Sequence, residues 1–165
     1  MCIRDRVNYG YLISWPCKQA PSPTQVGQNQ RWALPTIASG STSGSGRIST
    51  LVQNPNLVPW CLQSPGSVAA GQYVRIVTCP VTLTTSLTWT VYGDTGAYAT
   101  SYQITDGYGY CMQATDQNAA SPDLYPYGNQ VAKIVVRACN GSTLQKWNAP
   151  PGILDSIPFK DLNEQ

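Results

Sequence analysis

The sequence contains no histidine, and this absence excludes several kinds of active site. Nucleophilic sites of the Ser-His-Asp or Cys-His type need an imidazole base. Zinc sites that combine cysteine with histidine would lose half of their ligands. Asp94, Asp106, Asp116 and Asp123 are scattered, and their spacing places no two of them as an acid/base pair. We therefore expect a protein that is not an enzyme, with no catalytic residue, no metal site and no cofactor.

Charge and long apolar runs are also scarce. Charged residues make up 11% of the chain, against roughly 25% in an average globular protein. The net charge is +2 without a basic run, so a nucleic-acid partner is not expected. No stretch approaches the ~20 apolar residues of a membrane helix, so no membrane span is predicted.

The chain does contain six cysteines, and no two of them have C-x-x-C spacing. Spaced cysteines beside strand-like segments favour disulfides, which form in oxidising, extracellular compartments. We therefore predict a secreted, extracellular protein. The sequence shows no secretion signal, and residues 1–6 are similar to the translated adapter tag that begins some assembled sequences. We interpret residues 1–6 as a non-native tag and leave them out of the expected fold.

Three tryptophans recur at nearly equal intervals. Trp32, Trp89 and Trp147 lie 57 and 58 residues apart, and a cysteine precedes each of them. Self-similarity at a fixed period indicates one supersecondary unit used several times. We call these units lobes one, two and three. Because no segment has a long apolar period of 3.6 residues, little helix is expected.

Lobes two and three align around their cysteines. The segments W-C-L-Q at 60–63 and Y-C-M-Q at 110–113 open them, and strands with β-branched residues are predicted over 72–79 and 132–139. Lobe one has only the second half of this pattern, in residues 11–17 and 29–32. Its first strand and first cysteine are expected to be absent or replaced by the tag.

Two further segments lie outside the repeat. The run 38–46 is rich in Gly and Ser, which predicts a flexible surface loop between lobes one and two. The tail 150–165 contains five apolar residues. Either it docks on the domain or it tethers a neighbouring one, and the sequence leaves both open. These apolar residues are Ile153, Leu154, Ile157, Phe159 and Leu162.

The repeated pattern resembles the ricin B-type lectin domain. The resemblance lies in the C-L/M-Q openings, the strands that end in cysteine, the Asn140-Gly141 turn and the Q-x-W endings. It implies an all-β fold, a β-trefoil with three lobes of four strands that form a six-stranded barrel and a three-hairpin cap. The implied domain spans 7–149, with lobes at about 7–37, 47–94 and 100–149. Lobe one would be truncated at its N-terminal strand.

The resemblance also implies roles for particular residues. Each Q-x-W tryptophan is expected in the core, with the glutamine two residues earlier bonded to backbone. The lobe alignment implies the disulfides Cys61–Cys79 and Cys111–Cys139, and it leaves the pairing of Cys2 and Cys17 open. Asn140-Gly141-Ser142 fits a glycosylation sequon. A tight turn explains the same residues without a glycan, and we favour the turn.

Sugar-binding lobes of that family use three features. They are an Asp just after the first cysteine, an aromatic residue two positions before the second, and Asn-Gln leading into Q-x-W. The ring stacks on the C–H face of the sugar, and the polar groups hold its hydroxyls. Lobe one keeps Trp15, Asn29 and Gln30, so these residues form the principal candidate site. The alternative for Trp15 is an ordinary half-buried strand aromatic.

The other two lobes depart from the family pattern. Lobe two has Gln63, Val77 and Ser86-Leu87 at the three places, so we predict no binding there. Lobe three has Arg137 in place of the aromatic. A weaker second site in lobe three would use Gln113, Asp116, Tyr125, Tyr127 and Gln145. The alternative is that 125–128 is only a loop.

Two functions therefore compete. The resemblance implies a non-catalytic carbohydrate-binding module whose partners are galactose-type glycans, with a catalytic or toxin domain as a conceivable neighbour. The alternative is a structural or protein-interaction β-trefoil that has lost sugar binding, as the missing Asp in lobes two and three indicates. Q-x-W marks the fold and does not by itself prove sugar binding.

Overall fold

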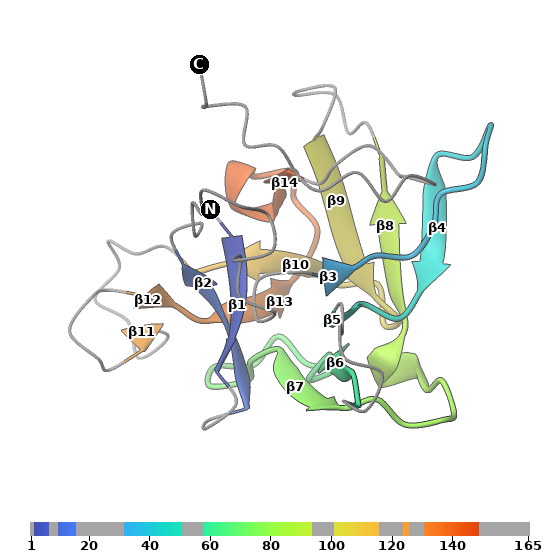
Figure 1. The fold of residues 1–165 in the computed structure, drawn as a ribbon. Helices are drawn as coiled ribbons and strands as arrows, with labels where there is room; N and C mark the ends of the chain where they lie inside the picture. The colour runs from blue at the N-terminus through green and yellow to red at the C-terminus, as the bar shows by residue number, and fades with distance from the viewer. Residues whose placement is uncertain are drawn as a thin grey trace, which may run out of the picture.

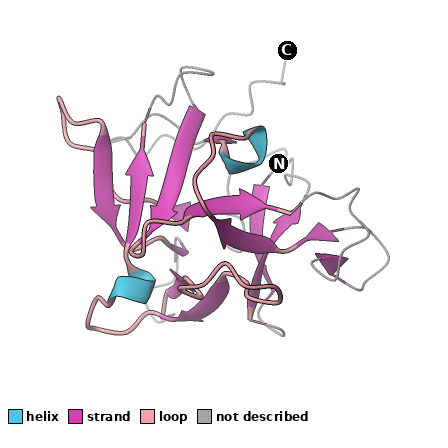
Figure 2. Ribbon diagram, turned by 180° about the vertical axis from the view of Figure 1, so that it is seen from behind, coloured by secondary structure: helices cyan, strands magenta, loops and turns pink. Residues whose placement is uncertain are grey.

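The computed structural model describes residues 2–6, 10–15, 32–50, 58–93, 101–115, 124–125 and 131–148. Within these ranges the regular structure is β-strand, apart from two short 3-10 helices at Thr85–Leu87 and Thr143–Gln145 (Figures 1 and 2). The expectation of an all-β protein is therefore confirmed for the part of the chain that the structure describes.

In the described part of the chain the strands pair in antiparallel fashion in three sheets. The first contains, in spatial order, β1 (Cys2–Arg6), β2 (Tyr11–Trp15), β7 (Arg75–Thr78), β6 (Trp60–Gln63), β5 (Ser49–Thr50) and β3 (Trp32–Ala33). The second contains β13 (Ile134–Arg137), β10 (Cys111–Ala114), β9 (Ser101–Asp106), β8 (Trp89–Tyr92) and β4 (Ser43–Gly46), with β14 (Trp147–Asn148) beside β9. A third pairs β11 (Leu124–Tyr125) with β12 (Val131–Ala132).

Three hairpins share one register relative to their cysteines. In each of the pairs β1–β2, β6–β7 and β10–β13, the first cysteine lies opposite the residue two positions before the second cysteine. The opposed pairs are Cys2 and Trp15, Cys61 and Val77, and Cys111 and Arg137. In this structure residues 2–6 therefore supply the hairpin strand that we expected to be absent or replaced by the tag. That these residues are non-native stays a prediction.

The three hairpins meet at one point. Leu12, Val74 and Ile134 each lie five residues before the second cysteine of their lobe, and all three are fully buried. The main-chain N–H of Leu12 donates to the carbonyl of Val74 at 3.0 Å, and that of Val74 donates to Ile134 at 2.9 Å. These contacts connect the hairpin of lobe one to that of lobe two, and the hairpin of lobe two to that of lobe three.

A second group of strands forms a curved wall beside the hairpins (Figure 1). The strand β3 pairs with β5, β4 pairs with β8, β8 pairs with β9, and β9 pairs with β14. Since β4 and β5 follow one another along 43–50, these strands form a continuous antiparallel series. Within the described residues, β3 and β14 are the two ends of this series.

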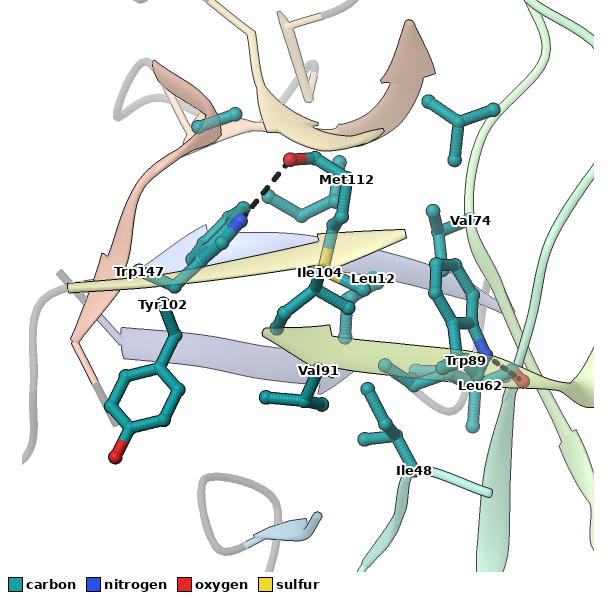
Figure 3. Close-up of a cluster of buried hydrophobic side chains, with 14 residues drawn as sticks. Leu12, Ile48, Leu62, Val74, Trp89, Val91, Tyr102, Ile104, Met112 and Trp147 are labelled. Atoms are coloured by element: carbon teal, nitrogen blue, oxygen red, sulfur yellow. Dashed lines mark hydrogen bonds between the residues drawn. The ribbon is translucent and has the colours of Figure 1, made fainter. Parts of the chain in front are cut away.

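The wall and the hairpins enclose the core, in which two tryptophans occupy matching places (Figure 3). The indole N–H of Trp89 donates to the carbonyl of Leu62 at 2.9 Å, and that of Trp147 donates to Met112 at 3.1 Å. Leu62 and Met112 each follow the first cysteine of their lobe. The core position expected for these two tryptophans is confirmed, whereas Trp32 is half-buried and packs against the cluster from its margin.

Candidate functional site

The best-defined polar cluster of lobe three is centred on Gln145. This side chain is fully buried at the end of the 3-10 helix that precedes Trp147. Its Oε1 accepts a hydrogen bond from the main-chain N–H of Asn140 at 3.0 Å. Its Nε2 donates to the carbonyl of Ala138 at 3.0 Å and to Oε1 of Gln113 at 2.9 Å. Two of these three partners are backbone groups, so the predicted backbone role of the Q-x-W glutamine is confirmed in this lobe.

Gln113 comes to this cluster from β10. It lies opposite Val135 of β13 and is half-buried. Because opposed residues of an antiparallel pair share one face, Gln113 shares the outer face with Cys111 and Arg137, while Met112 on the other face is buried in the core. The structure therefore brings together Gln113 and Gln145, two members of the predicted second site.

Arg137 links this face to lobe two. Its Nη1 donates to the carbonyl of Val136 at 2.9 Å and to that of Val68 at 3.3 Å. The guanidinium therefore lies where we expected a stacking aromatic in a sugar-binding lobe, and part of its bonding capacity is used by backbone. At the equivalent place of lobe two, Val77 offers neither a ring nor a donor.

The remaining predicted residues are placed only in part. Trp15 ends β2, and Tyr125 lies in β11, both placed here by their backbones alone. Asn29, Gln30, Asp116 and Tyr127 lie outside the described residues.

The hairpin register does bear on the missing Asp of lobe one. In lobes two and three the equivalent Asp is replaced by Gln63 and Gln113. Each lies two residues after the first cysteine of its lobe, opposite Arg75 and Val135 respectively. By the same count Arg4 holds this place in β1, opposite Ile13. Asp5 lies one position further along the strand and is therefore displaced from it.

A buried pair between lobes two and three was not foreseen from the sequence. Ser64 and Asp106 are both almost completely buried, and the hydroxyl of Ser64 donates to Oδ2 of Asp106 at 2.5 Å. Oδ1 of the same carboxylate accepts from the main-chain N–H groups of Tyr108 at 3.0 Å and Tyr110 at 2.8 Å. The Asp106-Gly107 dipeptide is a turn signal that could have indicated this role, because Asp side chains bond to backbone two residues on.

Both predicted disulfides are present. Cys61 is bonded to Cys79 with a Cα–Cα distance of 4.9 Å, and Cys111 to Cys139 with 5.0 Å. Cys17 lies outside the described residues, so its pairing with Cys2 stays open. Among the residues that the structure describes, no group of His, Cys, Asp and Glu could hold a metal ion. No helix in the same part of the chain is long and apolar enough to cross a membrane.

Comparison with known proteins adds no identification. No family model, no curated protein and no solved structure matches the chain. The resemblance to ricin B-type lectins therefore rests on the motifs of the chain itself and stays a prediction.

Proposed function

We propose that the chain is a secreted, non-catalytic, lectin-like module with a β-trefoil fold that binds galactose-type glycans. The observation that carries this proposal is the shared register of the three hairpins around their cysteines. A repeated hairpin with a matching tryptophan bond in lobes two and three is what the β-trefoil expectation requires. The meeting of Leu12, Val74 and Ile134 supports the same symmetry.

The principal site in this proposal is lobe one. Trp15 would stack on the C–H face of a sugar, and the side-chain amides of Asn29 and Gln30 would hold ring hydroxyls. With Arg4 rather than Asp two residues after Cys2, an acceptor expected of a binding lobe is replaced by a cation. Loss of one such hydrogen-bond partner costs about 1–3 kcal/mol, and each 1.4 kcal/mol is about tenfold in affinity. We therefore expect weak binding by the 165-residue chain.

A second candidate function is a β-trefoil that has lost sugar binding and serves as a structural or interaction module. Specific observations favour it. The amide of Gln145 is fully buried and makes three internal hydrogen bonds, so little of it is left for a ligand. In lobe two, the equivalent residue Leu87 is buried and apolar. Lobe three therefore uses this amide internally, and lobe two has no amide at the equivalent place.

Glycan-array binding separates the two functions. The protein extended upstream with its native sequence would be compared with its Trp15→Ala variant and with a Tyr125→Ala/Tyr127→Ala double variant. Tyr92→Ala is a matched control, because Tyr92 is an exposed aromatic of β8 outside both candidate sites. The proposal expects binding that free galactose competes, that Trp15→Ala abolishes and that Tyr92→Ala leaves unchanged.

Three other results would overturn parts of this assignment. Binding that survives Trp15→Ala and disappears in the Tyr125/Tyr127 variant would move the site to lobe three. The absence of glycan binding by the folded, extended protein would favour the structural or interaction module instead. Hydrolysis of a chromogenic glycoside by the purified domain would contradict the non-catalytic assignment.

A further inference from the structure

The turn that follows Cys139 contains Asn140, whose main chain is hydrogen-bonded to a buried side chain while the residue is exposed to solvent. Asn140 and Gly141 are exposed, and Gly141 has a φ of +70°. The main chain of Asn140 is anchored to the core, since its N–H donates to Oε1 of the buried Gln145 at 3.0 Å. The backbone of this residue is thus held by the core while the residue itself faces solvent.

The side chain of Asn140 is also oriented. Its Oδ1 accepts a hydrogen bond from the main-chain N–H of Ser142 at 3.0 Å, which is an Asx turn. Within the described residues no hydrogen bond is made by its Nδ2. A Cβ placed on Gly141 would meet no atom within 4 Å, so the space beside the turn is open. Asn140 is therefore an exposed residue whose carboxamide nitrogen makes no bond within the described residues, beside open space at Gly141.

The turn explains Asn140 and Gly141, but it does not use the hydroxyl of Ser142. Only the main-chain N–H of Ser142 takes part in the turn. Ser142 is the N-cap residue of the 3-10 helix Thr143–Gln145, and its side chain makes no capping bond there. A hydroxyl at this position is, however, the third requirement of the sequon N-x-S/T. Asn140-Gly141-Ser142 is the single such sequence in the chain.

We propose that Asn140 is an acceptor for an N-linked glycan when the chain is exported through a eukaryotic secretory pathway. A bond forms between Nδ2 of Asn140 and the anomeric carbon of a lipid-linked oligosaccharide diphosphate. The bond from that carbon to the diphosphate oxygen breaks, the lipid diphosphate leaves with the electron pair, and an amide proton passes to a base of the transferase. The disulfide Cys111–Cys139 beside the turn forms in the same oxidising compartment.

Three substitutions distinguish the sequon from the turn. Ser142→Ala keeps the main-chain N–H and hence the turn, but it removes the sequon. Ser142→Thr keeps both. Asn140→Asp keeps an oxygen that can accept from Ser142, but it removes the acceptor nitrogen. The three variants should therefore have the same thermal stability as the unmodified parent chain made in bacteria.

The test is secretion of the full 165-residue chain and its variants from eukaryotic cells behind a leader peptide, followed by intact mass measurement. The parent and Ser142→Thr are expected to carry one oligosaccharide, which a peptide:N-glycosidase removes while converting Asn140 to Asp. Ser142→Ala and Asn140→Asp are expected to carry none. A secreted, disulfide-bonded parent without this mass increase would overturn the proposal. So would modification that persists in Ser142→Ala.

Discussion

The side-chain amide of Gln145 donates a hydrogen bond to Oε1 of Gln113 at 2.9 Å and so connects the turn before Trp147 with strand β10. Gln145 has no counterpart in lobe two, where Leu87 occupies the same place before Trp89. One lobe therefore closes its repeat with a buried amide and the other with a buried apolar side chain. The tryptophan bonds that follow are nevertheless alike, at 3.1 and 2.9 Å.

The first prediction concerns this amide. Gln145→Leu, which copies lobe two, leaves the N–H of Asn140 and the carbonyl of Ala138 without their partner. Both groups are only partly buried, and a lost intramolecular hydrogen bond costs about 0.5–1.5 kcal/mol, so urea unfolding should show a loss of stability of at least that size. Leu144→Ala is the control, because Leu144 is 38% exposed. A Gln145→Leu variant as stable as the parent would show that the amide is dispensable for the fold.

The second prediction concerns the buried pair Ser64 and Asp106. Asp106→Asn replaces an acceptor oxygen by a donor and disturbs bonds to Ser64, Tyr108 and Tyr110. We expect it to destabilise the protein more than Ser64→Ala, because hydrogen bonds to charged groups contribute about 1.5–3 kcal/mol. In a double-mutant cycle the two changes should couple by about 0.5–3 kcal/mol. Additive losses would show that the pair contributes no shared interaction.

Much of the fold was predictable, because the cysteines and tryptophans mark positions that geometry fixes. Cys61, Cys79, Cys111 and Cys139 aligned the lobes and gave both disulfides correctly. The Ser64–Asp106 contact was not predictable, because it joins residues 42 positions apart in two different lobes. Sequence reasoning was limited in the same way at the candidate site. It grouped Gln113 and Gln145 in one site, but it did not predict the hydrogen bond between their side chains.

The third prediction concerns a cluster where the three hairpins meet. Tyr11, Tyr73 and Lys133 each lie six residues before the second cysteine of their lobe. The two rings make an edge-on contact at 5.4 Å, and Nζ of Lys133 lies 4.3 Å from the Tyr73 centroid and 5.4 Å from that of Tyr11. A cation over an aromatic face contributes about 0.5–1 kcal/mol at exposed sites and more when desolvated.

Lys133→Met keeps most of the apolar stem and removes the charge. We therefore expect thermal unfolding to show a loss of about 0.5–1 kcal/mol, attributable to the ammonium group. The matched control is Arg75→Met, which removes an exposed cation of β7. Equal effects of the two variants would assign the loss to net charge rather than to the two tyrosines.

The last prediction concerns the wall of strands and one further strand of lobe one, which would precede the hairpin strand that residues 2–6 supply. Within the described residues, β3 pairs with β5 and β14 pairs with β9, at the two ends of the wall. The directions of β3 and β14 are compatible with one further antiparallel strand between them, which the expected six-stranded barrel would require. Trp32 on β3 is half-buried, whereas Trp89 and Trp147 are buried. We expect native upstream sequence, when restored, to supply that strand.

A protein extended with its native upstream sequence should therefore melt at a higher temperature than the 165-residue chain, because exposed strand edges are destabilising liabilities. At this size each kcal/mol raises Tm by roughly 2–4 °C, and emission from Trp32 should shift to the blue as the ring becomes covered. Both proteins would also be measured without residues 150–165. Equal melting temperatures, with a loss in the 165-residue chain only when 150–165 are removed, would assign the strand position to the tail and refute the upstream assignment. Equal temperatures in all four proteins would show that no additional strand is needed.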